Sequence, residues 1–179
     1  MKKAIQDFQR YAKKEVEKMN KFQIYVLVGL PGSGKSTYAN QHMSEKPIIS
    51  RDAIRLGILK DEEEYFSHEH EVFKTYIDAI VNNCKLIGCA VADATHISRA
   101  SREKLFYALD AKIGGCYDTI MIYFNTPFEI CSNRNRKRDG RACVPEAAMY
   151  SMFRQFSYPA YEEHESVKEI WDINVKEKC

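Results

Sequence analysis

The strongest indication of the fold lies in nine consecutive residues, Gly29-Leu30-Pro31-Gly32-Ser33-Gly34-Lys35-Ser36-Thr37. They contain a complete G-x-x-x-x-G-K-[ST] motif, whose glycine-rich loop binds phosphate groups between a strand and a helix. The segment Phe22–Leu30, with the apolar run Ile24–Leu30, leads into the motif and has the pattern of a buried strand. A helical pattern follows to about Met43. The motif therefore stands in the context that a phosphate-binding loop, or P-loop, requires.

Each residue type in this loop has a role in holding phosphate groups. Glycines let the backbone curl so that its N–H groups point at phosphate oxygens, and the following helix adds the positive end of its dipole. Lys35 is expected to reach the β- and γ-phosphates of ATP, and Ser36 to supply a hydroxyl ligand to Mg²⁺. The sequence therefore predicts an ATP·Mg²⁺ site formed by Gly29, Gly32, Ser33, Gly34, Lys35, Ser36 and Thr37.

The rest of the chain alternates strand and helix patterns. Further strands are predicted at 47–50, 86–94, 118–125 and 169–173. Helices are predicted at 52–59, 62–84, 98–113, 127–137 and 145–156. This alternation indicates an α/β fold, a mostly parallel five-stranded sheet with helices on both faces. Residues 1–20 are expected to form a helix that packs on one domain, residues 21–179, with an arginine-rich lid at 127–145.

The composition is that of an ordinary globular protein. Apolar residues make up 45% and charged residues 29%, and the net charge is only +2. Any nucleic-acid-binding surface must therefore come from local clusters of basic residues. The six cysteines form no C-x-x-C pair, no apolar run is long enough to span a bilayer, and no signal region follows the start. We therefore predict a cytoplasmic protein with no membrane contact, whose oligomeric state the sequence leaves open.

Asp52 and Arg55 lie just after the predicted second strand, in Ser50-Arg51-Asp52-Ala53-Ile54-Arg55. Ligands of a parallel sheet gather at the carboxyl ends of its strands, so Asp52 is expected near the γ-phosphate. There it could accept the proton of an attacking hydroxyl, as the general base of a kinase does. Arg55, one helical turn further on, could grip a phosphate of the acceptor. Position alone leaves open the alternative that Asp52 only caps the next helix.

Asp93 ends the predicted strand in Ala90-Val91-Ala92-Asp93-Ala94-Thr95-His96. A carboxylate there resembles a Walker B aspartate, which holds Mg²⁺ directly or through water. It could instead orient Arg55 or cap the strand end. His96 could contact substrate, although a polar surface residue is the commoner role. The segment His68-Glu69-His70-Glu71 lacks the spacing of a metal site and is interpreted as a polar helix face.

Basic residues gather in the segment 133–141, where five of nine residues are Lys or Arg. Arg134, Arg138 and Arg141 are spaced by four and three, so they would share one face if the segment were helical. An arginine that covers the transferring phosphoryl group stabilises its charge and can raise the rate by about 10³–10⁵-fold. Alone, the segment suggests a solvated basic face or a non-specific nucleic-acid patch. Together with the P-loop it favours a mobile lid.

In this order the motifs resemble the polynucleotide 5′-kinase family, which includes bacteriophage polynucleotide kinase and bacterial RNA-repair kinases. The shared elements are Gly-x-Pro-Gly-Ser-Gly-Lys-Ser-Thr, Ser-Arg-Asp-x-x-Arg, Asp-Ala-Thr, Arg-x-x-x-Arg and Val-Pro, spread from about Phe22 to about Tyr161. The resemblance implies that the chain transfers the γ-phosphate of ATP to the 5′-hydroxyl end of DNA or RNA in nucleic-acid repair. It also implies that Arg138 is the main lid arginine, with Arg134 assisting near the nucleotide.

On the acceptor side, the same resemblance implies that Asp52 is the general base for the 5′-hydroxyl. Arg55 would hold the neighbouring phosphate of the acceptor, with Asp93 supporting it. His96 departs from the family pattern, because relatives often carry asparagine after Asp-Ala-Thr. No D-x-D phosphatase motif occurs in the chain, so a 3′-phosphatase activity is not expected.

Two other functions compete with this one. A P-loop kinase of a small molecule, such as a nucleoside, sugar or antibiotic, would use the same base and lid with a different acceptor pocket. A non-catalytic nucleotide-binding regulatory module would need only the P-loop. The guanine-selecting N-K-x-D motif is absent, and the set of Lys35, Asp52 and Arg138 is complete. These features favour an enzyme over a binding module.

Overall fold

The computed structural model describes residues 21–60 and 62–174, and the helix predicted for residues 1–20 lies outside them. The described part of the chain contains one sheet with the strands β1 (Phe22–Val28), β2 (Ile48–Ser50), β3 (Cys89–Asp93), β4 (Tyr117–Phe124) and β5 (Val167–Ile173). The strand order is β2-β3-β1-β4-β5, and every neighbouring pair is parallel. This confirms the predicted parallel five-stranded sheet.

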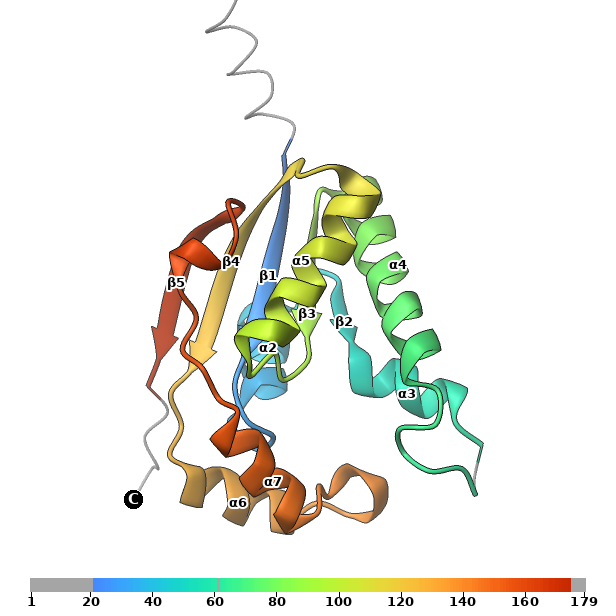
Figure 1. The fold of residues 1–179 in the computed structure, drawn as a ribbon, viewed down its shortest axis with the longest axis vertical. Helices are drawn as coiled ribbons and strands as arrows, with labels where there is room; N and C mark the ends of the chain where they lie inside the picture. The colour runs from blue at the N-terminus through green and yellow to red at the C-terminus, as the bar shows by residue number, and fades with distance from the viewer. Residues whose placement is uncertain (1–20, 61, 175–179) are drawn as a thin grey trace, which may run out of the picture.

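Helices connect these strands, and their arrangement is visible in Figure 1. They are α2 (Lys35–His42), α3 (Arg51–Ile58), α4 (Glu69–Ile87), α5 (Arg99–Ile113), α6 (Phe128–Arg136) and α7 (Glu146–Arg154), with two short 3₁₀ helices, η1 (Gly140–Ala142) and η2 (Tyr161–Glu163). The strands point toward α6 and α7, which lie beyond the carboxyl ends of the sheet (Figure 1). None of the helices in the two described ranges combines the length and the apolar character that crossing a bilayer demands.

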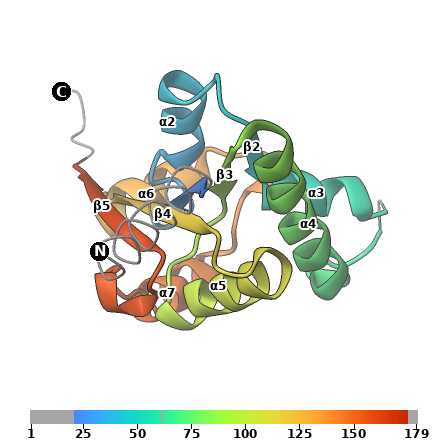
Figure 2. The same ribbon diagram turned by 90° about the horizontal axis from the view of Figure 1, so that it is seen from above.

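The central strand β1 is buried on both faces. Alternate residues of a strand point to opposite sides of the sheet. Ile24, Val26 and Val28 pack with α4 and α5, whereas Tyr25 and Leu27 pack with α2. Figure 2 shows α2 on one side of the sheet and α5 on the other. A strand that is buried on both faces needs apolar residues at consecutive positions. Because β1 is the middle strand, the P-loop that follows it lies at the carboxyl end of the sheet, near its centre.

The helix predicted at 62–84 begins later than expected, at Glu69 of α4. The residues before it form turns, in which local side chains satisfy backbone groups. Lys60 N–H donates to Glu63 Oε2 at 2.9 Å, and Ser67 Oγ donates to a backbone carbonyl at 2.7 Å. Such local bonds compete with helix formation. The connection between α3 and α4 is therefore a loop, which becomes important at the site.

Candidate functional site

The P-loop joins β1 to α2, and its backbone takes conformations that suit glycine. Gly32 and Gly34 have φ values of +80° and +99°, in the left-handed region that side chains disfavour. A Cβ atom on Gly32 would lie 2.4 Å from the carbonyl oxygen of Cys131 in α6. Thr126 Oγ1, just before α6, donates to the carbonyl oxygen of Ser33 at 2.9 Å. The P-loop is therefore packed directly against the first helix of the lid.

Lys35 is buried against the loop that it follows. Its Nζ donates to the carbonyl oxygens of Gly29 at 2.8 Å and Leu30 at 2.7 Å. Burial lowers the pKa of Lys35 to about 8, although the nearby Asp93 carboxylate opposes that shift. A triphosphate bound to the loop would add negative charge that favours the protonated lysine. The ammonium group thus lies where phosphate recognition needs a cation.

Ser36 and Asp93 bring two oxygen atoms together beside the P-loop. Strands β1 and β3 are parallel neighbours, so the loop after β1 lies next to Asp93, the last residue of β3. Ser36 Oγ donates to Asp93 Oδ2 at 2.9 Å, and burial raises the pKa of the Asp93 carboxyl. Hydroxyl and carboxylate oxygens are ligands that Mg²⁺ accepts in proteins. The pair therefore fits the metal ion that accompanies ATP.

A network of polar side chains surrounds Arg55 in α3. Its guanidinium contacts the Asp52 carboxylate and donates to Tyr65 Oη at 3.1 Å. It also donates to the two carboxylate oxygens of Glu69 at 3.1 and 2.9 Å. Tyr65 Oη donates in turn to Asp52 Oδ1 at 3.0 Å, and Arg51 contacts the same Glu69 carboxylate. The structure thus brings Asp52 and Arg55 together, and it adds Tyr65 and Glu69, which the sequence did not single out.

The structure excludes the interpretation of Asp52 as the helix cap. The cap of α3 is Ser50, whose Oγ accepts a hydrogen bond from Ala53 N at 3.3 Å. Asp52 lies in the first turn instead, and its side chain is 69% exposed. A carboxylate that two donors hold on one side still presents lone pairs to solvent on the other. It can therefore accept a proton from an incoming hydroxyl.

The lid arginines divide between two places. Arg134 and Arg138 line an open cavity of about 420 Å³ beside the P-loop, together with Gly32, Gly34, Thr37, Tyr38, Gln41, Phe124 and Ile173. Helix α6 ends at Arg136, so the helical spacing that would place Arg141 on the same face does not continue. Arg141 instead donates to the carbonyl oxygen of Lys60 at 3.2 Å. The lid therefore reaches across to the loop between α3 and α4.

The cavity and the Arg55 network lie on opposite sides of the P-loop. Phe124 and Ile173 in the cavity wall are the last residues of β4 and β5. Asp52 follows β2, at the other edge of the sheet, and β1 lies between these edges. The arrangement can therefore hold a phosphate donor and an acceptor on the two sides of Lys35.

His96 is only 5% exposed, so it is not the polar surface residue that the sequence favoured, and little of its side chain is left to contact a substrate. Its Nδ1 lies 2.9 Å from the carbonyl oxygen of Leu27, and its Nε2 lies 3.4 Å from Tyr76 Oη. Its φ is +42°, a value that His and Asn tolerate better than most residues.

Acid should destabilise the native chain more than the His96→Asn variant. Burial lowers the pKa of His96 to about 4, from an ordinary 6.5. Between pH 6.5 and pH 4, His96 is protonated in the unfolded chain but stays neutral in the folded chain. The free energy of unfolding therefore falls as pH falls. We expect the native chain to lose about 2.5 kcal/mol more than the variant between pH 7 and pH 4.5. Urea unfolding of both chains at the two pH values checks this, and equal losses would contradict a neutral buried imidazole.

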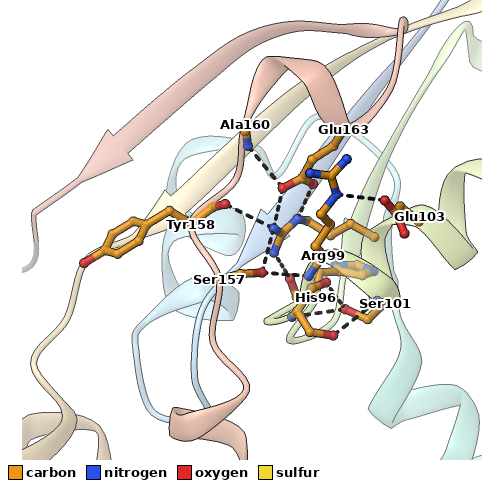
Figure 3. A network of polar contacts seen from close by, with 10 residues as sticks. His96, Arg99, Ser101, Glu103, Ser157, Tyr158, Ala160 and Glu163 are labelled. Atoms are coloured by element: carbon orange, nitrogen blue, oxygen red, sulfur yellow. Dashed lines mark hydrogen bonds and ion pairs between the residues drawn. The ribbon is translucent and has the colours of Figure 1, made fainter.

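A buried ion pair between Arg102 and Glu163 joins α5 to η2, within the network of polar contacts drawn in Figure 3. The side chains of Arg102 in α5 and Glu163 in η2 are 0% and 1% exposed, and two hydrogen bonds of 2.6 Å join them. Arg102 also donates to the carbonyl oxygen of His96 at 2.8 Å. Nearby, Ser157 N–H donates to the carbonyl oxygen of Ile97 at 2.9 Å. The segment after α7 is therefore held against α5 and the residues that precede it.

Comparisons with known proteins agree with this description. A family model described as an AAA domain matches residues 24–159, and no curated protein matches the chain. Among solved structures, a chain of the Pnkp1/Rnl/Hen1 RNA repair complex is 25% identical, with a TM-score of 0.63 over 75% of this chain and 44% of that chain. The present chain thus spans less than half of that relative. The resemblance to polynucleotide kinases that the motifs indicated is confirmed by this match.

Two further structures resemble the chain over nearly their whole length. A protein from Chloroflexus aurantiacus j-10-fl has a TM-score of 0.67 at 13% identity, over 87% of this chain and 86% of that chain. A sugar kinase from Janibacter sp. HTCC2649 has a TM-score of 0.57 at 16% identity, over 86% and 85% of the two chains. At these identities the likeness shows a shared fold.

Proposed function

The chain belongs to the AAA domain family and has the fold of a P-loop kinase, and on that basis we propose that it transfers the γ-phosphate of ATP to the 5′-hydroxyl end of a polynucleotide. The observation that carries this proposal is the contact between an exposed carboxylate, Asp52, and a guanidinium, Arg55, across the P-loop from the nucleotide cavity. Asp52 can deprotonate a hydroxyl while Arg55 binds a phosphate of the same acceptor. A nucleic-acid end carries both groups, and the similarity to the RNA repair complex supports this class of acceptor.

Each proposed catalytic residue acts on a stated part of the reaction. Asp52 takes the proton from the 5′-hydroxyl, whose oxygen forms a bond to the γ-phosphorus while the bond from that phosphorus to the bridging oxygen of ADP breaks. Lys35 and Arg138, on the donor side, stabilise the negative charge on the transferring group. Ser36 and Asp93 would hold Mg²⁺, which neutralises charge on the β- and γ-phosphates when bound. The products are ADP and a 5′-phosphorylated end.

The nucleotide itself is assigned to the cavity between α2, the lid and the ends of β4 and β5. Arg134 and Arg138 line its lid side, and the backbone of Gly32 and Gly34 lines its floor. A charged wall and a glycine floor suit the triphosphate. Aromatic and aliphatic residues in the same wall, Tyr38, Phe124 and Ile173, offer apolar surface for the nucleobase.

A P-loop kinase of a small molecule is the second candidate, and one observation favours it. The match with the present chain covers 85% of the sugar kinase. The match with the RNA repair chain covers only 44% of that chain. A chain of this size is therefore sufficient for a small-molecule kinase. The acceptor side distinguishes the two functions, because only a phosphate-bearing acceptor needs Arg55.

The experiment that tests the proposal compares acceptors that differ in phosphate. Labelled γ-phosphate of ATP is offered to RNA and DNA oligonucleotides with free 5′-hydroxyls, to nucleoside 3′-phosphates, and to free nucleosides and sugars. We expect label on the oligonucleotides and the nucleoside 3′-phosphates. Arg55→Gln should raise KM for these acceptors, whereas Arg99→Gln, at an exposed arginine of α5, should not.

Two outcomes of this experiment would overturn the proposal, and a third would change the role of one residue. Efficient labelling of a phosphate-free small molecule that Arg55→Gln leaves unchanged would identify a small-molecule kinase. Binding of ATP without transfer to any acceptor would identify a regulatory module. Transfer to oligonucleotides that Arg55→Gln leaves unchanged would remove Arg55 from the acceptor site.

A further inference from the structure

An exposed aromatic ring stands next to the Arg55 network. Phe66 lies in the loop between α3 and α4, and its side chain is 61% exposed. The Arg55 guanidinium carbon lies 4.6 Å from the centre of the Tyr65 ring and 5.4 Å from the centre of the Phe66 ring. The two rings are perpendicular, with centres 4.9 Å apart. Phe66 therefore borders the group proposed to bind an acceptor phosphate.

The ring is held in place although it is exposed. Tyr65, against which its edge packs, is fixed by hydrogen bonds to Asp52 and Arg55. The loop is closed by local hydrogen bonds, and the lid residue Arg141 donates to the carbonyl oxygens of Lys60 at 3.2 Å and Glu63 at 3.4 Å, from the other side. A largely exposed ring beside partners that are themselves held by hydrogen bonds is suited to stacking.

Single exposed apolar residues are common and usually need no explanation. Tyr107 in α5 is 73% exposed, and no residue of the proposed reaction is in α5. Phe66 differs because its ring touches the residues that hold Asp52. Phe66 follows Tyr65, which contacts Asp52, and its ring lies beside Arg55. An acceptor held by both residues would therefore have an aromatic ring next to it.

We propose that Phe66 is the stacking platform for the base of the 5′-terminal nucleotide of the acceptor. This inference rests on the proposed function and adds the residue that binds the base. The sugar hydroxyl would lie on Asp52, the adjacent phosphate on Arg55, and the base on the open face of Phe66. Stacking on an aromatic ring tolerates any base, so this contact selects nucleic acid over sugars without selecting a sequence.

The kinetic test uses Phe66→Ala and an acceptor that lacks its 5′-terminal base. With an intact oligonucleotide, the substitution should raise the KM for the acceptor by about 5- to 150-fold. The KM for ATP and kcat at saturating acceptor should stay unchanged. With the abasic acceptor the native chain and Phe66→Ala should have the same KM, because the stacked group is missing from both complexes. Tyr107→Ala is the matched control and should leave the KM for both acceptors unchanged.

A binding test gives a readout besides activity. Trp171 is the only tryptophan in the chain, so the double substitution Phe66→Trp and Trp171→Phe leaves one fluorophore at the proposed platform. An oligonucleotide should quench its fluorescence, and the abasic oligonucleotide should not. The Phe66→Trp substitution alone should keep the acceptor KM close to the native value.

The outcomes separate this inference from the proposed function. If the native chain phosphorylates no oligonucleotide, the proposed function fails. If it does phosphorylate them, but Phe66→Ala leaves the acceptor KM unchanged or raises it equally for the abasic acceptor, the platform is overturned and the kinase assignment stands. Quenching by the abasic oligonucleotide as strong as by the intact one would overturn the platform as well.

Discussion

The substitution Asp52→Asn is expected to lower kcat for γ-phosphate transfer by about 10²–10⁴-fold. Asparagine has the shape of aspartate, and its amide oxygen can still accept the hydrogen bond that Tyr65 Oη donates at 3.0 Å. It cannot take a proton from the acceptor hydroxyl, so the loss should fall on the chemical step. Single-turnover transfer to a labelled oligonucleotide measures that step directly, and equilibrium binding of ATP and acceptor should be little changed.

Asp118→Asn is the matched control for this substitution. Asp118 is a partly exposed carboxylate near the start of β4, where it pairs with Lys21. The start of β4 lies at the end of the sheet away from the site. Loss of the Asp118 charge should therefore leave kcat unchanged. A decrease of less than about tenfold for Asp52→Asn would contradict the role of general base. A decrease explained wholly by weaker acceptor binding would make Asp52 a binding residue.

The substitution Arg102→Met should lower the free energy of unfolding by about 3–5 kcal/mol. It removes one partner of an ion pair whose side chains are 0% and 1% exposed, so the Glu163 carboxylate stays buried without its counter-charge. It also removes the hydrogen bond to the carbonyl oxygen of His96. Urea unfolding at pH 7, followed by circular dichroism, measures the loss.

Two comparisons make this prediction specific. The double substitution Arg102→Met and Glu163→Met removes both charges and should recover much of the stability that the single change loses. Arg99→Met breaks a solvent-exposed pair with Glu103 on the same helix and should cost about 0–1 kcal/mol. A loss for Arg102→Met no larger than for Arg99→Met would show that the buried pair does not fix the segment after the lid.

The sheet could be predicted from the sequence because its causes are local. The P-loop motif requires a strand before it and a helix after it, and the apolar run 24–28 before the motif is typical of a buried strand in a parallel sheet. The start of α4 could not be placed, because the loop before Glu69 is stabilised by its own side-chain bonds rather than by a break in hydrophobic pattern. Such competition between local bonds and a helix is not visible in residue spacing.

The site could be predicted only where its residues belong to one motif or follow one strand. Lys35, Asp52 and Asp93 became candidates in this way. Glu69 was interpreted as part of a polar helix face, whereas it binds Arg51 and Arg55 of the preceding helix. Helical spacing tells which residues share a face, but it does not tell which element that face meets. The sequence placed Glu69 inside a helix predicted at 62–84, 14 and 18 residues after Arg55 and Arg51, so its spacing linked it to neither arginine.

The buried charge pair was another feature that could not be predicted from the sequence. Arg102 and Glu163 are 61 residues apart, and no local pattern links them. His96 was equally hidden, because its burial and its left-handed backbone follow from the packing of three elements around the end of β3 rather than from its neighbours in sequence.

The segment 127–156, which contains the lid and α7, is bound to the core at both of its ends. Thr126 is bound to the carbonyl of Ser33 in the P-loop, and Ser157 is bound to the carbonyl of Ile97. The residues between them form an excursion whose closure entropy changes only slowly with length. A change in the length of the loop 137–145 therefore adds little closure cost and leaves the register of the strands unaltered, whereas α6 stays in place because it packs against Gly32 of the P-loop. A lid loop of another length on the same core would in this way cover an acceptor of another size.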